Sequence, residues 1–261
     1  TDDVIMGGVA VELVHIGSLY HDDVMDEAEM RRNAPSVNSR WGNLKAILAG
    51  DFLLARASEI AAGLGTEVAG LLAATISQLC EGQILELRDT YNVDRTQEDY
   101  ERSIAGKTAS LLATACRVGG IVGECPRADI DALTEFGHAY GMAFQIVDDI
   151  LDVIATDDQL GKPAGNDLLE GVYTLPVLRA MRTEAGSELR SLLGGELSVA
   201  QRDRARDLVR ASAGVDDALH EARGWADKAG AVLTSLPASA STDALLAAAN
   251  HHIRRAADPL S

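Results

Sequence analysis

The sequence predicts an all-α protein, and three observations support this fold class. Hydrophobic residues make up 47% of the chain but aromatic residues only 4%, so the core must consist mainly of Ala, Leu, Val and Ile. Ala and Leu are strong helix formers. Apolar residues recur at helical spacing along nearly the whole chain, and no segment shows the alternation of a half-buried strand. The 261 residues contain no repeat or low-complexity linker and fit one domain with a sizeable core.

The helical pattern is divided by recognisable breaks. It is interrupted at Asn33-Ala34-Pro35, at Gly63 and Gly65, and at Gly123. A stretch rich in Gly and Asp at 156–173 predicts a loop. We expect helices over residues 3–27, 40–62, 66–90, 96–107, 108–122, 128–155, 174–185, 187–194, 198–211, 214–234 and 242–256.

Charge and cysteine usage narrow the classes of function. The net charge is −17, from 40 acidic and 23 basic residues, and such a chain is repelled by nucleic-acid backbones. The spacing of Cys80, Cys116 and Cys125 matches neither a disulfide framework nor a zinc site, which favours a reducing cytoplasm. No uncharged apolar run reaches the roughly 18–20 residues of a membrane span, so we expect no transmembrane segment. The chain opens almost directly in a helical pattern, and we expect an N-terminal part to be missing.

The first candidate site is an acidic cluster near the end of the first expected helix. Asp22 and Asp26 share a helical face, and Asp23 lies beside them. Three carboxylates on one turn repel one another unless cations neutralise them. Oxygen ligands favour Mg²⁺ or Ca²⁺ over zinc.

A second cluster repeats this pattern in the middle of an otherwise apolar helix. Asp148 and Asp152 are again four residues apart, with Asp149 between them. Carboxylates are almost never fully buried without a partner, and burying them ionised and unpaired is costly. The same triplet on two distant helices favours cation binding over a solvated helix face.

Basic residues near both clusters indicate what those cations would face. Arg31 and Arg32 follow the first cluster by little more than a helical turn, and Lys107 and Lys162 each follow a glycine. Together with cation-binding carboxylates, they predict a diphosphate held by Mg²⁺ on one side and by Lys and Arg on the other.

The ordered set of motifs resembles the trans-isoprenyl diphosphate synthases, also called polyprenyl synthetases, over nearly the whole chain. The matching stretches are His15, 21–26, 31–32, 50–53, 81–83, 106–109, 145–152 and 161–176. The resemblance implies an antiparallel helical bundle around a deep central cavity, with residues 1–261 forming a single polyprenyl synthetase domain. It also implies a transferase of isoprenoid biosynthesis (EC 2.5.1 class). Such an enzyme condenses isopentenyl diphosphate with an allylic diphosphate, farnesyl or geranylgeranyl, to give an all-trans polyprenyl diphosphate.

The resemblance also assigns metal ligands. Asp22, Asp26 and Asp148 would bind three Mg²⁺ ions that hold the allylic diphosphate. The remaining members of the six-residue metal-binding set would support them: Asp23, Asp149 and Asp152.

Substrate contacts follow from the same resemblance. The allylic diphosphate would be contacted by Arg31, Lys107 and Lys162, and the isopentenyl diphosphate by His15 and Arg32. The residues expected beside the reacting carbons, or lining the cavity near them, are Thr108, Gln145, Gln83 and Glu86. The family's Gly-Gly-Lys-Arg-like stretch, which holds isopentenyl diphosphate, is not found before the first aspartate motif, nor are the helices that usually precede it.

In the family that the sequence resembles, the product grows down the cavity below the first aspartate motif, and the residues before that motif are small here. Ser18, Gly17 and Val14 lie four, five and eight positions before Asp22, where a Phe or Tyr would act as a floor for the growing chain. One helical turn of about 5.4 Å approximates one isoprene unit. We therefore expect products longer than C20.

Other readings stay open at this point. The alternatives are a short-chain (C15–C20) synthase, a class I terpene cyclase, and a non-catalytic subunit of a two-chain synthase. A di-iron bundle is disfavoured because no Glu-x-x-His pair appears. The resemblance further implies a cytoplasmic homodimer, with transient membrane contact for product release left open.

Overall fold

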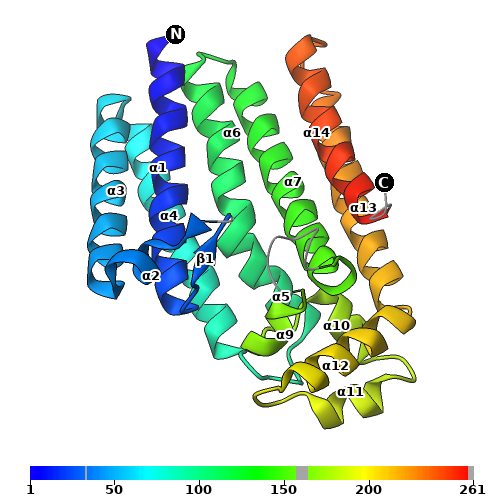
Figure 1. The fold of residues 1–261 in the computed structure, drawn as a ribbon. Coiled ribbons are helices and arrows are strands. Elements are labelled where there is room, and N and C mark those ends of the chain that lie inside the picture. The colour runs from blue at the N-terminus through cyan, green and yellow to red at the C-terminus, as the bar shows by residue number, and fades with distance from the viewer. Residues whose placement is uncertain (33, 157–163, 258–261) are drawn as a thin grey trace.

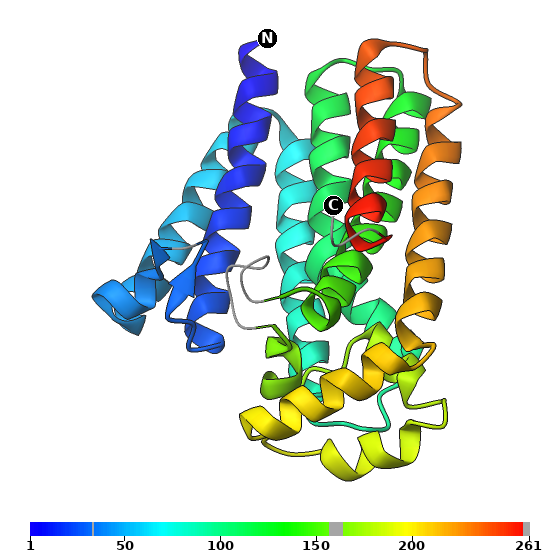
Figure 2. The same ribbon diagram turned by 45° about the vertical axis from the view of Figure 1, so that its right-hand side comes forward.

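A computed structural model describes residues 1–32, 34–156 and 164–257 as a bundle of helices (Figure 1). The long helices lie side by side, with α3 on one outer side and α13 and α14 on the other. The shorter α11 and α12 lie across one end of the bundle (Figure 2). The all-α fold is therefore confirmed.

The helices follow the expected order closely. The elements of the N-terminal half are α1 (Asp2–Met25), β1 (Met30–Arg31), β2 (Ala34–Pro35), α2 (Val37–Trp41), α3 (Asn43–Gly63), α4 (Thr66–Arg88), α5 (Gln97–Ile104), the π-helix η1 (Ala105–Ala109) and α6 (Ser110–Val122). Those of the C-terminal half are α7 (Arg127–Ile154), α9 (Asn166–Glu170), α10 (Leu175–Ala180), α11 (Gly186–Leu192), α12 (Val199–Ala211), α13 (Gly214–Leu233) and α14 (Ala240–Ala257).

Local signals explain several helix starts. The Thr1 hydroxyl accepts a hydrogen bond from the Val4 N–H at the start of α1. Ser198 and Gln201 form a capping box at the start of α12. Pro176 lies in the first turn of α10, where its missing N–H leaves no intrahelical bond unmade.

Three expectations about secondary structure need correction. The prediction that the chain has no strand was wrong at one place. Two strands of two residues each form a hairpin, in which Met30 pairs with Pro35 and Arg31 with Ala34. Two short helices were not predicted, α2 and, inside the expected loop 156–173, α9. The expected break between 107 and 108 is instead a π-helical turn that joins α5 to α6 without interruption.

Three apolar clusters of the described residues hold the bundle together, and one of them lies between α7, α13 and α14 and contains Phe136 and Leu233. The other two are larger. One lies between α7, α10, α12 and α13 and contains Ile146, Ile150, Tyr173 and Leu175. The other lies between α1, α3, α4 and α6 and contains Val14 and Leu72.

Two helices in the described ranges, α1 and α4, are long and apolar enough to cross a membrane by length and composition. The search for uncharged runs did not predict them. About a quarter of the apolar stretch of each helix is buried, 22% in α1 and 28% in α4, and both helices pack against α3 and α6 here. We therefore regard them as bundle helices.

Candidate active site

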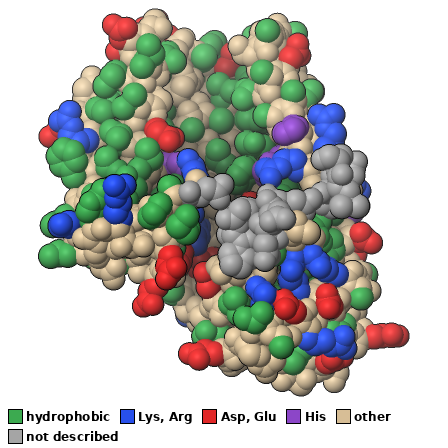
Figure 3. Space-filling view, viewed as in Figure 1, with side chains coloured by type: hydrophobic (Ala, Val, Ile, Leu, Met, Phe, Trp, Pro, Cys, Tyr) green, Lys and Arg blue, Asp and Glu red, His purple; other side chains and the backbone are tan. Residues whose placement is uncertain are grey.

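The two aspartate motifs lie at the C-terminal ends of α1 and α7. Figure 3 shows that this face of the molecule is hollowed between α1 and α14, with hydrophobic side chains along the hollow.

The first motif contains a buried residue, Asp23, a partly buried one, Asp22, and an exposed one, Asp26. Asp26 follows α1 directly, and its N–H donates to the Asp22 carbonyl oxygen at 2.9 Å, so the two residues are one turn apart. The Asp23 carboxylate is buried, and its Oδ1 accepts from Arg31 Nε at 2.8 Å and Nη2 at 2.5 Å. The β1–β2 hairpin thus folds Arg31 back onto Asp23.

The second motif is divided in the same way. The Asp148 side chain is exposed, whereas Asp149 and Asp152 are each 3% exposed. Asp149 Oδ2 accepts from the Tyr100 hydroxyl at 2.6 Å, and its Oδ1 accepts from Gln145 Nε2 at 2.8 Å. Asp152 Oδ2 accepts from the Asp167 N–H at 3.4 Å.

This division bears on the six expected metal ligands. The carboxylate oxygens of Asp23 and Asp149 accept hydrogen bonds from protein side chains. These two residues can therefore hold the more exposed members of the motifs in position rather than bind a cation directly. Asp22, Asp26 and Asp148 keep their carboxylates toward the accessible side. Within the described ranges, no three Asp, Glu, His or Cys side chains form a complete cation site by themselves.

The C-terminal end of α7 is held by arginines from α12. Arg206 Nε donates to the Val153 carbonyl at 2.8 Å, and its Nη2 donates to the Ala155 carbonyl. Arg210 reaches the Val153 carbonyl at 2.8 Å. Cations at a helix C-terminus satisfy free carbonyls and favour the helix dipole, so this contact fixes the end of α7 beside Asp152.

Lys107 lies within electrostatic range of Asp22 and Asp26, and a close helix crossing positions it. A Cβ atom on Gly82 of α4 would lie 2.4 Å from the Lys107 nitrogen, and one on Gly106 would lie 2.8 Å from the Gln78 carbonyl oxygen. Only glycine fits at both positions. The π-helical turn at this crossing carries Lys107 and Thr108, and Lys107 Nζ lies 2.5 Å from Glu86 Oε1.

The pKa values of the carboxylates indicate a site that requires cations. Burial raises the pKa of Asp22 to about 6, assisted by Asp26 and Glu86 and opposed by Lys107 and Arg31. Burial also raises the pKa of Asp26. Burial raises the pKa of Asp149 to about 7, although its hydrogen bonds from Tyr100 and Gln145 act in the opposite direction. Strongly perturbed carboxylates of this kind cluster at functional sites.

The expected substrate residues are largely brought together. Thr108 Oγ1 donates to Gln145 Oε1 at 2.7 Å, and Arg32 Nη2 lies 3.3 Å from His15 Nε2. Burial lowers the pKa of His15. Gln83 is buried, and its Oε1 meets no hydrogen-bond partner in the described part of the chain. Lys162 lies outside the described residues.

The three chain-length candidates are placed differently. A Cβ atom on Gly17 would lie 3.2 Å from the Gly50 carbonyl oxygen and 3.2 Å from Leu54 Cγ, so Gly17 faces α3. Val14 is fully buried in the cluster between α1, α3, α4 and α6. Ser18 is partly exposed, and its hydroxyl donates to the His15 carbonyl at 2.9 Å. Only Ser18 therefore remains accessible.

Sequence reasoning missed Tyr100, Arg206 and Arg210. Each acts through a contact with a distant segment, such as the 49 residues that separate Tyr100 from Asp149. No local spacing signals such contacts.

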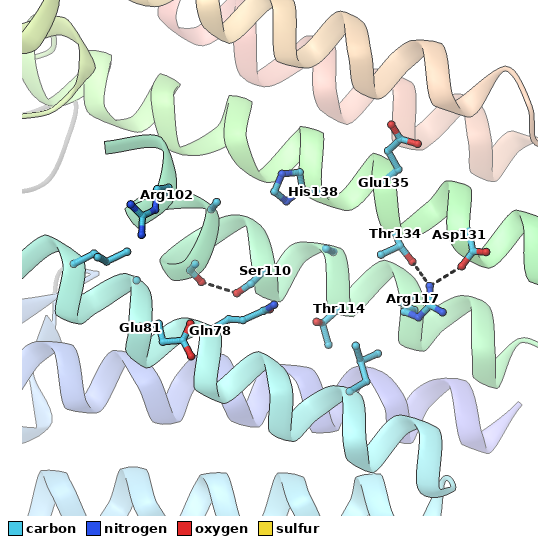
Figure 4. A pocket seen from close by; sticks show the side chains of 16 residues that line it. Gln78, Glu81, Arg102, Ser110, Thr114, Arg117, Asp131, Thr134, Glu135 and His138 are labelled. Carbon is cyan, nitrogen blue, oxygen red and sulfur yellow. Dashed lines mark hydrogen bonds and ion pairs between the residues drawn. The ribbon is translucent and has the colours of Figure 1, made fainter. Parts of the chain in front are cut away.

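A separate pocket of about 750 Å³ lies between α4, η1, α6 and α7 (Figure 4). It shares Gly82 and Gly106 with the crossing described above, but neither aspartate motif lines it. Arg117 in this pocket donates to Asp131 Oδ1 at 2.8 Å and to Thr134 Oγ1 at 3.1 Å.

The aspartate-lined site defines a class of protein. Carboxylates that need cations, a lysine within electrostatic range of two of them and an apolar hollow beside them are typical of the all-α enzymes that act on isoprenoid diphosphates. The resemblance of the motifs points to the trans-prenyltransferases within that class.

Comparisons with known proteins identify the family. The polyprenyl synthetase family model matches residues 1–210. The chain is 42% identical over 257 residues to a nonaprenyl diphosphate synthase of Mycobacterium tuberculosis, covering 97% of this chain and 76% of the relative. It is 40% identical over 230 residues to a heptaprenyl diphosphate synthase component 2 of Geobacillus stearothermophilus, covering 88% of this chain and 72% of the relative.

A solved structure agrees with the sequence comparisons. A polyprenyl synthase from Caulobacter crescentus, complexed with calcium and isoprenyl diphosphate, matches with a TM-score of 0.91 at 34% identity, covering 96% of this chain and 78% of that one. The chain therefore belongs to the polyprenyl synthetase family of trans-prenyltransferases.

Proposed function

We propose that this protein condenses isopentenyl diphosphate with farnesyl or geranylgeranyl diphosphate to give an all-trans polyprenyl diphosphate longer than C20. The observation that carries the proposal is the position of Lys107, within electrostatic range of Asp22 and Asp26 and paired with Glu86, which is itself in range of Asp149. Both aspartate motifs and one cation thus serve a single diphosphate site.

The proposed cofactor is Mg²⁺, with three ions held by Asp22, Asp26 and Asp148. All three side chains offer oxygen ligands, which Mg²⁺ prefers, and Mg²⁺ is usually bound by one or two carboxylates together with substrate phosphates. The calcium bound in the Caulobacter relative supports a divalent cation here. When bound, the cations stabilise negative charge on the leaving diphosphate.

The roles proposed for the protein side chains come from the resemblance of the motifs to the family. Lys107, with Arg31 and Lys162, would contact the allylic diphosphate and stabilise the charge that builds on it as the C–O bond breaks. His15 and Arg32 would hold the isopentenyl diphosphate. The apolar hollow would exclude water from the allylic cation.

The carbon–carbon bond then forms between the two substrates. The double bond of isopentenyl diphosphate attacks the cation beside Thr108 and Gln145, and the departing diphosphate accepts the proton that is lost. This scheme needs no His or Glu as a general base.

The length of the product is supported by two observations. The relatives in the comparison carry heptaprenyl and nonaprenyl names. Ser18, the accessible position one turn before Asp22, has a small side chain that leaves space for a growing chain.

We propose a single domain over 1–261 that forms a homodimer in the cytoplasm. Apolar side chains exposed on neighbouring faces of α3 and α4 support an interface: Leu44, Ile47, Leu48, Phe52, Ile84 and Leu87. A relative named as component 2 makes a two-chain enzyme the alternative. Light scattering on the purified protein separates the two assemblies. The mass of two copies of this chain indicates the homodimer, and a complex that forms only after co-expression with a second, different chain indicates the two-chain enzyme.

Product analysis tests the proposal. Purified full-length enzyme is incubated with Mg²⁺, labelled isopentenyl diphosphate and farnesyl or geranylgeranyl diphosphate, and the dephosphorylated products are sized. We expect a Mg²⁺-dependent ladder ending beyond C20. A sharp stop at C15 or C20 would indicate the short-chain alternative, and release of hydrocarbon without elongation would indicate a terpene cyclase.

A further inference from the structure

Four polar side chains form a continuous chain of hydrogen bonds from α5 to η1, buried at Tyr100 and Asp149 and partly exposed at Gln145 and Thr108. Tyr100 donates to Asp149 Oδ2 at 2.6 Å, and Gln145 Nε2 donates to Asp149 Oδ1 at 2.8 Å. Thr108 Oγ1 donates to Gln145 Oε1 at 2.7 Å. The side chains of Tyr100 and Asp149 are 1% and 3% exposed, so water cannot replace either partner easily.

The chemistry of these groups fixes the direction of every bond. In its ionised form Asp149 only accepts hydrogen bonds, so the end of the Gln145 side chain that meets this carboxylate is then the NH₂ group. The Gln145 carbonyl oxygen then points toward Thr108, and it can only accept. The Thr108 hydroxyl hydrogen is therefore directed at Gln145, and the lone pairs of its oxygen point elsewhere.

That polarity matters beside a developing allylic cation. Oxygen lone pairs stabilise positive charge, whereas an N–H or O–H hydrogen directed at the same place destabilises it. If the Gln145 amide were reversed, its NH₂ group would face Thr108, and the Thr108 hydroxyl hydrogen would be free to rotate toward the substrate.

Tyr100 is itself held in place. The Arg95 guanidinium lies 5.5 Å from the centroid of the Tyr100 ring, and Arg95 Nη1 donates to the Tyr173 carbonyl oxygen at 3.1 Å. Arg95 is 6% exposed. A buried arginine therefore ties the tyrosine to the segment before α10, so its hydroxyl has a fixed position.

We propose that Tyr100 is a positioning residue for catalysis. Through Asp149 it sets the orientation of the Gln145 amide, and through Gln145 that of the Thr108 hydroxyl, so that lone pairs face the allylic cation. This inference rests on the proposed condensation reaction. It also assigns Asp149 to the orientation of these groups rather than to cation binding.

The first test compares two variants that each remove one buried hydroxyl. Tyr100→Phe breaks the bond to Asp149, and Thr75→Val breaks the 2.6 Å bond between Thr75 and Thr114, which has no link to Gln145. We expect kcat to fall about 10- to 100-fold in Tyr100→Phe, with KM for both substrates little changed, because supporting residues have effects of this size. Thr75→Val should retain kcat at a similar loss of melting temperature. Equal kcat values in the two variants would overturn the proposal.

A double-mutant cycle separates positioning from general destabilisation. If Tyr100 acts through Thr108, the variant Tyr100→Phe/Thr108→Val should have nearly the same kcat as Thr108→Val alone. Fully additive losses would contradict the relay. Asp149→Asn provides a second way to break the chain if Tyr100→Phe folds poorly, and we expect the same selective loss of kcat.

A measurement that needs no turnover keeps this inference distinct from the proposed reaction. In ¹⁵N-labelled metal-free protein, the Gln145 side-chain amide, assigned by its disappearance in Gln145→Leu, should exchange its hydrogens slowly. Tyr100→Phe should accelerate that exchange at least tenfold, whereas Thr75→Val should not. Unchanged exchange would refute the relay even if the enzyme is active, and accelerated exchange without product would refute only the reaction.

Discussion

Lys107 Nζ lies 2.5 Å from Glu86 Oε1, and this ion pair interacts electrostatically with both aspartate motifs, through Asp22 and Asp26 on one side and Asp149 on the other. Burial alone would lower the pKa of Lys107, but Glu86, Asp22 and Asp26 together raise it, so the amine stays charged. The metal-free site therefore already holds a cation among its carboxylates. An incoming diphosphate would compete with Glu86 for this lysine.

Removal of the Lys107 charge should affect catalysis more than folding. We expect Lys107→Met, which keeps the apolar stem, to lower kcat/KM for the allylic substrate about 100- to 1,000-fold, the usual effect of losing one group that stabilises transition-state charge. Glu86→Gln is the matched control, because it removes the ion pair but leaves the lysine charged. Steady-state kinetics would contradict this role if Lys107→Met retained activity within threefold of the wild type.

Asp22 should destabilise the metal-free protein at neutral pH. Its pKa is raised from 3.8 to about 6 by burial, so the folded state binds this proton more tightly than the unfolded chain does. Stability therefore falls as pH rises between those two values, and the full penalty is present above about 6.

Asp22→Asn should relieve this penalty. In EDTA at pH 7.5 we expect the variant to be more stable than the wild type by about 1 kcal/mol, after allowing for solvent screening. The difference should be largely lost at pH 4 and should disappear below the unfolded-state pKa of 3.8, and the variant should be inactive at every pH. Urea titrations at the two pH values provide the measurement, and a constant difference between them would be inconsistent with the raised pKa.

The crossing of α4 and η1 should tolerate no side chain. A Cβ atom on Gly82 would lie 2.4 Å from the Lys107 nitrogen and 2.8 Å from the Gly106 carbonyl carbon, both backbone atoms that cannot move aside independently. We expect Gly82→Ala to lower the free energy of unfolding by about 2–3 kcal/mol.

Gly70 on the same helix is the matched control, since a Cβ atom there meets nothing within 4 Å. Gly70→Ala should raise stability by about 0.5–1 kcal/mol, because alanine is the better helix former. Urea midpoints measure both changes. A Gly82→Ala variant as stable as Gly70→Ala would mean that the two elements do not approach so closely.

The sequence could reveal features that depend on spacing within one helix, but not those that depend on contacts between distant segments. Asp22 with Asp26, and Asp148 with Asp152, are visible because a spacing of four residues alone places side chains on one face of a helix. The π-helical turn at 105–109 was not visible, since Ala105, Lys107 and Ala109 favour an ordinary helix. That turn accompanies the Gly82–Gly106 contact, which is a property of the packed bundle. The same is true of Tyr100, whose role depends on a partner 49 residues away.

The arginines of α12 should stabilise the C-terminal end of α7, which carries the second aspartate motif. Arg206 donates to the Val153 and Ala155 carbonyls at the end of α7. We expect Arg206→Ala to destabilise the protein by about 1–2 kcal/mol, since bonds from a charged donor are lost at a helix C-terminus. It should also raise the Mg²⁺ concentration needed for half-maximal activity, because Asp148 and Asp152 lie in the last turns of α7.

Arg204 on the same helix forms an exposed ion pair with Glu188 Oε1 at 2.7 Å and, among the described residues, no hydrogen bond or ion pair with α7. Arg204→Ala should change stability by less than about 0.5 kcal/mol and leave the Mg²⁺ requirement unchanged. Thermal melts and Mg²⁺ titrations of the two variants provide the comparison. Identical Mg²⁺ requirements would show that Arg206 stabilises the fold without positioning the motif.

The length of the product should depend on Ser18 rather than on Gly17. Both precede Asp22 by about one helical turn, but a side chain at Gly17 would meet Gly50 and Leu54 of α3, whereas Ser18 is partly exposed. We expect Ser18→Phe to shorten the product by at least one isoprene unit at nearly unchanged stability, because the ring occupies space that a growing chain would use.

Gly17→Phe should instead separate α1 from α3 and lower the melting temperature by several degrees, since overpacking of this kind costs about 1–3 kcal/mol. Chromatography of the dephosphorylated products, paired with melting curves, separates the two effects. Shortening by Gly17→Phe in a stable protein, with none by Ser18→Phe, would place the growing chain on the α3 side of α1 and reverse this assignment.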